Sequence, residues 1–139
     1  MRGANETITV WNRWRNPVTQ KHEWFRCIVP NCSWETEIVA QPTTTGAVMA
    51  NTYNILVSEH QDYRPPTEWE ALPDKSTAFT FRPSDIVALG KVTREITGIE
   101  PETEARLKDA LAPNVFTIKV VADRTQGYKL GRHYEVSGV

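Results

Sequence analysis

The amino-acid sequence predicts a mainly β protein, a small barrel or sandwich of about seven strands with one short helix and two long loops. Two observations carry this prediction. From Val115 to Ala122, apolar residues recur at every second position, which is the period of a half-buried strand. The chain also contains 9 prolines, which disfavour long helices and favour short elements separated by turns.

The length and charge of the chain narrow the possibilities. A chain of 139 residues fits a single domain, 1–139, and folding buries roughly two-thirds of the surface of a chain this long. The formal net charge of −1 gives no general attraction to nucleic acid. No apolar stretch approaches the roughly 18 residues of a membrane span, and none resembles a signal peptide. We therefore expect a soluble, cytoplasmically made domain that does not contact a membrane.

The N-terminal part of the chain predicts a loose leader followed by three strands. The leader is residues 1–6, and residues rich in β-branched and aromatic side chains then predict strands at Thr7–Asn12, Glu23–Val29 and Cys32–Ala40. Pro30 and Asn31 are typical turn residues, so the last two strands are expected to form a hairpin. The small, polar run Gln41–Asn51 predicts a mobile loop.

A fourth strand, Thr52–Ser58, leads into the first long loop, Glu59–Ala78. Three prolines limit this loop to one helical turn, around Glu68–Leu72. Long loops in compact domains are commonly functional, and this one is rich in aromatic and charged residues. It is either a docking arm or a loop that folds over the barrel. As a docking arm it would offer three interface residues to a partner: Tyr63, Arg64 and Trp69.

The second half of the chain predicts a buried strand, a helix and a final pair of strands. Ile86–Gly90 is wholly apolar and ends in glycine, as expected of a buried strand entering a bend. The helix is expected to begin at Pro101 and to end before Pro113, with two favourable ion pairs, Glu102–Arg106 and Glu104–Lys108. The strand that follows would place Phe116, Ile118, Val120 and Ala122 on one apolar face.

The second long loop, Asp123–Arg132, precedes the last strand, Tyr134–Ser137. It carries Arg124, Lys129 and Arg132, and it would either meet phosphate or an acidic partner surface or remain a solvated tip. Both interpretations stay open at the level of the sequence.

Catalysis and metal binding find little support in the sequence. The three histidines, His22, His60 and His133, begin no metal or triad motif. Cys27 and Cys32 lack the second pair of ligands that a zinc site requires, and we expect two small, mostly buried side chains. The sequence therefore predicts a protein that is not an enzyme and that carries neither cofactor nor metal.

A nucleic-acid contact is an alternative. Trp14 and Arg15 lie in a segment, residues 11–26, where aromatic and basic residues alternate. Small barrels that bind single strands combine stacking on aromatic rings with a basic groove. The competing interpretation is that the tryptophans belong to the core and that the arginines are its solvated neighbours.

Three parts of the chain share a pattern with a known family. They are the opening, with Ile8–Asn12 and Val29–Trp34, the middle, Phe81–Gly90, and the end, with Thr117-Ile118, Asp123-Arg124, Gly127 and Arg132–Gly138. Together they resemble small minor virion proteins of tailed bacteriophages. Within this pattern, Ser84 stands where the family has glycine, and Tyr134 stands where it has tryptophan.

The resemblance implies a head–tail connector protein of the stopper or head-completion type. Such a protein is a small β-barrel that forms a homo-oligomeric ring around the DNA channel in the neck of the virion. Its partners would be the portal or adaptor ring on one side and the tail terminator or tail tube on the other. Double-stranded DNA would pass through without sequence-specific binding. The alternatives are another tail or baseplate component and a single-strand nucleic-acid-binding barrel.

Overall fold

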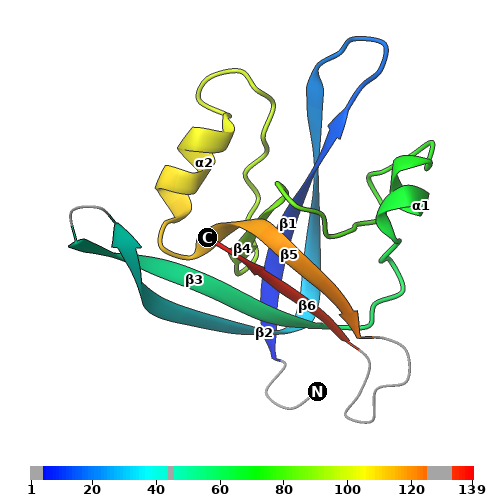
Figure 1. Cartoon of the computed structure of the whole chain (residues 1–139). Coiled ribbons are helices and arrows are strands. Elements are labelled where there is room, and N and C mark those ends of the chain that lie inside the picture. Colours follow the sequence, from blue (N-terminus) through cyan, green and yellow to red (C-terminus); the bar gives the residue numbers. More distant parts are fainter. Residues whose placement is uncertain (1–4, 44–45, 125–132) are drawn as a thin grey trace.

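A closed antiparallel β-barrel forms the centre of the molecule (Figure 1). The computed structural model describes residues 5–43, 46–124 and 133–139. Within these ranges the strands follow each other around the barrel in the order β1-β2-β3-β6-β5-β4. The elements are β1 (Glu6–Arg15), β2 (His22–Thr43), β3 (Gly46–Ser58), α1 (Pro66–Glu70), β4 (Ile86–Leu89), α2 (Glu104–Leu111), β5 (Val115–Arg124) and β6 (His133–Gly138). The predicted small β-barrel is confirmed, with six strands and two short helices in the described ranges.

The expected hairpin around Pro30 and Asn31 is wrong, because β2 runs through both residues as one strand of 22 residues. Asn31 has a φ of 62°, and the pairing of β1 with β2 shifts here, since Ile8 faces Val29 whereas Glu6 faces Cys32. One extra residue in β2 is thus accommodated as a bulge, which bends the strand instead of reversing it. Beyond the bend, β2 leaves β1 and pairs with β3.

The expected mobile loop Gln41–Asn51 is also wrong, because its described residues belong to β2 and β3. The two strands stay in register from Glu37↔Thr52 to Thr43↔Gly46, whereas β3 pairs with β6 only from Tyr53 onwards. Residues 37–43 and 46–52 therefore form a two-stranded ribbon, here called the arm, which projects from the barrel (Figure 1, left). A ribbon outside the barrel need not carry the apolar alternation that marks a half-buried strand, so residues 41–51 gave no strand signal.

The long loop Glu59–Ala78 folds over one end of the barrel. It contains α1 close to the predicted helical turn, and Tyr63 forms a parallel bridge with Phe79. Trp69 in α1 is fully buried, and Phe79 and Phe81 just after the loop are buried as well. The sequence left open a docking arm or a loop folded over the barrel, and the structure shows the folded loop. Its aromatic side chains close this end of the core.

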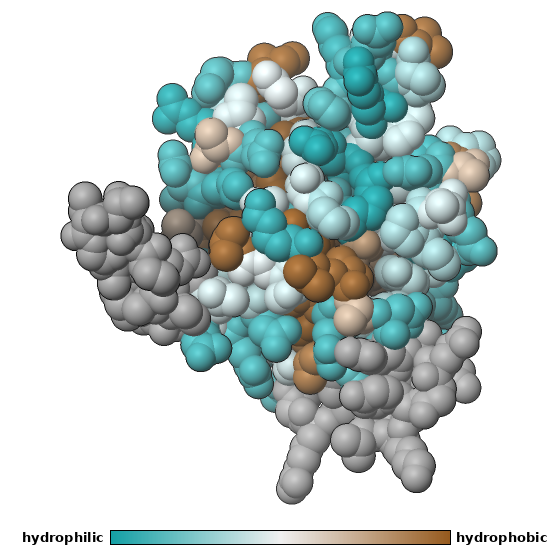
Figure 2. Space-filling view, viewed as in Figure 1, coloured by the Kyte–Doolittle hydropathy of each residue, from teal (hydrophilic) through white to brown (hydrophobic). Residues whose placement is uncertain are grey.

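A bulge in β5 changes which residues face the interior. Phe116 and Ile118 are buried as expected, but the pairing with β6 shifts between Ile118 and Val120. Val120 is consequently 60% exposed, and Val121 packs against the core instead. The predicted apolar face of this strand is therefore wrong beyond Ile118. Figure 2 shows apolar surface near the middle of the face that β5 and β6 present.

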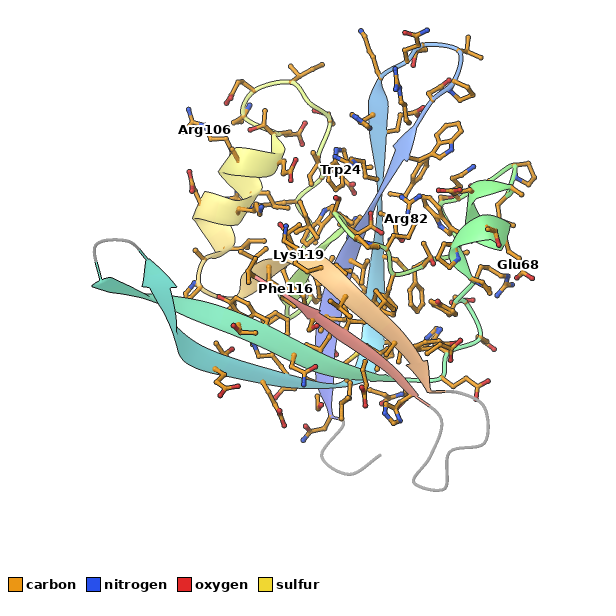
Figure 3. The ribbon with its side chains drawn as sticks, viewed as in Figure 1. Trp24, Glu68, Arg82, Arg106, Phe116 and Lys119 are labelled. Carbon is orange, nitrogen blue, oxygen red and sulfur yellow. The ribbon has the colours of Figure 1, made fainter. Side chains whose placement is uncertain are left out.

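Helix α2 begins at Glu104, not at the predicted Pro101, because Thr103 caps it by accepting a hydrogen bond from the Arg106 N–H. The pair Glu104–Lys108 forms at 4.0 Å, but Arg106 pairs with Glu100 at 3.2 Å, and so the expected pair with Glu102 is absent. Arg106 points away from the barrel (Figure 3). The helix ends before Pro113 as predicted, and its Leu107 is buried in a cluster with Trp11, Ile86 and Val115. Among the helices of the described ranges, none has the length and apolar character that crossing a membrane requires.

Gly138 allows β5 and β6 to approach closely, and this contact generates a prediction. A Cβ atom at this position would collide with the carbonyl oxygen of Thr117 and lie 2.7 Å from the ring of Phe116. We expect Gly138→Ala to lower the free energy of unfolding by about 1–3 kcal/mol, as overpacking of a core does. Chemical denaturation measures the difference. Ser137→Ala, the neighbour on the opposite face of β6, is the control, and an equal loss there would contradict this account.

Candidate functional site: a basic pocket beside the β1–β2 hairpin

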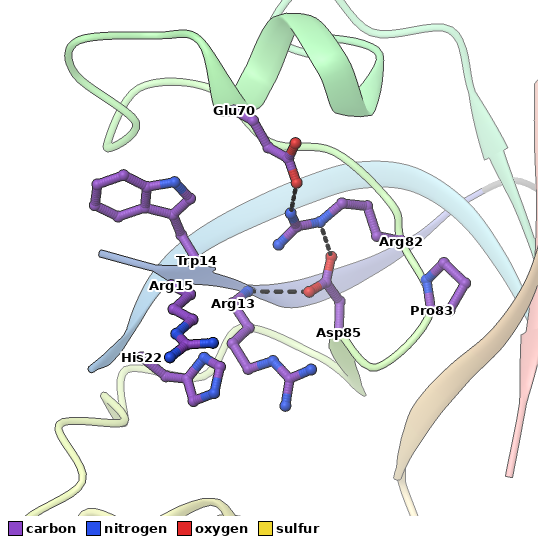
Figure 4. Close-up of a pocket in the computed structure, with 8 residues that line it drawn as sticks. All are labelled: Arg13, Trp14, Arg15, His22, Glu70, Arg82, Pro83 and Asp85. Carbon is purple, nitrogen blue, oxygen red and sulfur yellow. Dashed lines mark hydrogen bonds and ion pairs between the residues drawn. The ribbon is translucent and has the colours of Figure 1, made fainter. Parts of the chain in front are cut away.

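A pocket of about 390 Å³ lies where the β1–β2 hairpin leaves the barrel (Figure 4). One wall is the hairpin, and the other is formed by α1 and the turn before β4. We call it the basic pocket; its lining residues are Arg13, Trp14, Arg15, His22, Glu70, Arg82, Pro83 and Asp85.

The buried carboxylate of Asp85 joins the two walls. The pairing of β1 with β4 ends at Trp11↔Ile86, so the next outward N–H of β1, that of Arg13, has no strand carbonyl opposite it. Asp85 Oδ1 accepts this N–H at 3.0 Å, and Oδ2 accepts from Asn12 Nδ2 at 2.8 Å. The side chain of Asp85 thereby takes the place of the missing strand.

Asn12 fixes the same junction from the other side. It is fully buried, its Nδ2 donates to the Thr80 carbonyl at 2.7 Å, and its Oδ1 accepts from the Thr80 N–H at 3.1 Å. The amide thus pairs with Thr80 as a neighbouring strand would. The turn that holds Arg82 and Asp85 is positioned by these bonds.

Arg82 is the positive partner of the pocket's carboxylates. It pairs with Asp85 at 3.4 Å and with Glu70 of α1, and its guanidinium lies 4.7 Å from the ring centre of Trp69. Burial raises the pKa of Asp85 above its ordinary value of 3.8, and the Arg13 N–H, the charge of Arg82 and the Asn12 amide each oppose that rise. The charge of Arg82 is therefore balanced within the pocket.

The positive charges of Arg13 and Arg15 are not balanced in this way. The two side chains lie on one face of β1, and His22 faces Arg15 across the hairpin (Figure 4). Among the residues that the structure describes, neither guanidinium has an ion-pair or hydrogen-bond partner, and the same holds for the His22 ring. The pocket therefore presents an excess of positive charge suited to an anionic group.

Trp14, the predicted stacking residue, is used within the molecule. The ammonium of Lys75 lies 4.2 Å from the centre of its ring, and Phe25 packs beside it at 6.5 Å. Lys75 is itself buried and donates to the Leu72 carbonyl. One face of Trp14 is thus covered by the long loop. Of the predicted nucleic-acid contacts, Arg15 is exposed and Trp14 is half-buried.

The predicted interface residues separate into three groups. Trp69 is fully buried. Tyr63 is half-buried, and its ring packs at a tilt against that of Tyr134, with 4.1 Å between the ring centres. These rings hold the loop on the barrel and do not offer a docking surface. Arg64 donates to the carbonyls of Gln61 and Tyr63 and fixes the same loop. Lys129, Arg132 and the side chain of Arg124 lie outside the described residues.

The sequence analysis missed the polar network around Asp85. Its members are distant along the chain, since Asn12 and Asp85 differ by 73 positions. One local signal was available. An aspartate placed directly before a wholly apolar strand becomes buried with it, and a buried carboxylate requires partners.

Comparison with known proteins adds one result. The protein-family model described as "family of unknown function (DUF6751)" matches residues 3–139. The chain belongs to this family. The comparisons with curated proteins and with solved structures gave no match.

Neither thiol of this DUF6751 member is placed for chemistry. Both Cys27 and Cys32 are free. Cys32 is fully buried, and burial raises its pKa to about 12. Cys27 is half-buried, and burial is again the main cause of its raised pKa. Within the ranges that the structure describes, no three His, Cys, Asp or Glu side chains gather closely enough to hold a metal ion.

Removing the Asp85 carboxylate is expected to destabilise this family member. Asp85→Ala leaves the Arg13 N–H and one N–H of Asn12 without acceptors in a buried setting, which costs about 1–3 kcal/mol. Thermal or chemical denaturation measures the loss. Glu70→Gln removes the more exposed partner of Arg82 and should cost less than about 1 kcal/mol. Equal losses in both variants would contradict the central role of Asp85.

The raised pKa of Asp85 predicts a pH dependence. The folded protein binds the proton of the Asp85 carboxyl group more tightly than the unfolded chain does. This tighter binding stabilises the fold in full at pH values below the ordinary pKa of 3.8. The contribution declines as the pH rises through the higher folded-state value. Asn at this position cannot titrate. The unfolding free energy of the wild type minus that of Asp85→Asn should therefore fall over this range, as the pH rises from below 3.8 through the higher folded-state value. A difference that rises over this range would show that the pKa is lowered.

Proposed function

We propose that the protein is a structural virion protein of a tailed bacteriophage that acts by assembly and not by catalysis. In this proposal it is a head–tail connector of the stopper or head-completion type, a ring in the neck through which double-stranded DNA passes. The neighbours would be the portal or adaptor on one side and the tail terminator or tail tube on the other. The resemblance of the sequence to minor virion proteins supplies the phage assignment.

The observation that carries the proposal is the arm. Residues 37–43 and 46–52 pair only with each other within the described ranges, beyond the part of β3 that joins β6. An isolated two-stranded ribbon is marginally stable in water and gains stability by packing against another surface. Such an extension on a closed barrel suits a subunit that reaches a neighbour.

A tail or baseplate component is an alternative within the same particle, because the arm serves any repeated assembly equally well. A single-strand nucleic-acid-binding barrel has one observation in its favour, the unpaired Arg13 and Arg15 of the basic pocket. Against it, Lys75 covers one face of the Trp14 ring that base stacking would need, and the net charge of the chain is −1. We therefore rank assembly above nucleic-acid binding.

Peptide mass spectrometry on purified particles of the source phage tests the proposal, with the portal protein as internal standard. We expect a copy number equal to that of the portal or a simple fraction of it, since stacked rings share their symmetry. A copy number many times higher would instead assign the protein to the tail tube or to the capsid surface. Absence from the particle would overturn both virion assignments.

A further inference from the structure

An acidic surface lies on β2 beyond its bend. Glu35 and Glu37 are exposed on one face of the strand, and in the part of the chain that the structure describes neither carboxylate has a hydrogen-bond or ion-pair partner. Asn54 and Thr52 face them across the pairing with β3. These side chains line a hollow of about 440 Å³, here called the acidic groove.

The acidic groove and the basic pocket match in charge and in spacing. Arg13 and Arg15 are two residues apart on β1, and Glu35 and Glu37 are two residues apart on β2. Side chains at this spacing share one face of a strand and start about 6.6 Å apart. Each guanidinium can therefore meet one carboxylate when the two strand faces approach each other.

Within one molecule these two surfaces do not meet. The basic pocket lies at the start of β2, next to His22, whereas the acidic groove lies after the bend at Asn31. At about 3.3 Å per residue, the path along the strand from His22 to Glu35 is about 43 Å long, with the bend between its two ends. In Figure 1 the β1–β2 hairpin and the arm project in different directions from the barrel. Within the described residues, these charges therefore have no partner in the same molecule.

We propose that the acidic groove of one copy docks into the basic pocket of a second copy, with Glu35 and Glu37 pairing with Arg13 and Arg15. A contact between two different surfaces of the same chain is head-to-tail, so it repeats from copy to copy and closes into a ring when the rotation allows. Closure into a ring rests on the proposed function; the contact itself rests on the charges and their spacing. Each such contact pairs the groove of one copy with the pocket of the next, so the repeat supplies both surfaces with a partner.

Charge reversal tests this contact on the full-length protein. Sedimentation velocity over a concentration series should show self-association of the wild type that weakens between about 0.05 and 0.5 M salt. Arg13→Glu with Arg15→Glu, and separately Glu35→Arg with Glu37→Arg, should each raise the dissociation constant at least about tenfold, because like charges then face each other. An equimolar mixture of the two variants should restore association, since the native groove of the pocket variant fits the native pocket of the groove variant and the two reversed surfaces fit each other. The variant with all four reversals should regain self-association.

The matched control is Lys91→Glu with Lys119→Glu, which changes the net charge by the same amount as the pocket variant at two exposed lysines outside both surfaces. Wild-type association must survive in this control. A wild type that stays monomeric at every concentration, a control that dissociates equally, or a mixture that fails to associate would overturn the contact.

A nucleic-acid ligand is a separate outcome of the same experiment. Binding of a labelled dT20 oligonucleotide that is lost in the pocket variant, with an unchanged sedimentation profile, would assign the pocket to nucleic acid and overturn the contact. The proposed function fails by a different measurement, absence of the chain from purified particles. Self-association that follows the charge reversals would stand even then.

Discussion

The short length of β4 is the constraint on which the rest of the structure depends. This strand has 4 residues, whereas β1 beside it has 10, so the outer edge of β1 loses its strand partner after Trp11. Unpaired backbone groups in a buried position are costly. The carboxylate of Asp85 accepts the Arg13 N–H in place of the missing strand, and the amide of Asn12 bonds the backbone of Thr80 and so holds that segment against the hairpin. The basic pocket exists because side chains, and not a longer β4, complete this edge of β1.

The barrel was predictable from sequence wherever one face of a strand is buried. β4 and β6 and the first half of β5 carry their apolar pattern in the sequence, and the structure has them at those positions. β2 could not be predicted in this way. Proline followed by asparagine is equally compatible with a tight turn and with a bulge, and only the presence of two successive partners, β1 and then β3, decides between them. The bulge after Ile118 has no local signal either.

The candidate site was predictable only in its charges. Trp14 and Arg15 were predicted as ligand contacts because basic and aromatic residues alternate in this segment. The structure shows that the Trp14 ring already contacts the ammonium of Lys75, which is far along the chain. The tertiary fold thus turned a supposed stacking platform into a support for the long loop. The charges of the pocket are divided in a similar way. Arg82 is paired with both Glu70 and Asp85, so among the described residues Arg13 and Arg15 are the arginines of the pocket that can bind an anionic ligand. Sequence indicated which charges were present, and the contacts decide which of them are available.

The arm has a consequence for handling the protein in isolation. Among the residues that the structure describes, each strand of the arm pairs on one side only, so the other side carries backbone donors and acceptors that an extended chain can add to. Natural proteins protect such edges with charge, and Glu35 and Glu37 flank the base of this ribbon. At high protein concentration the open edges nevertheless leave the molecule liable to sheet-like aggregation through the arm.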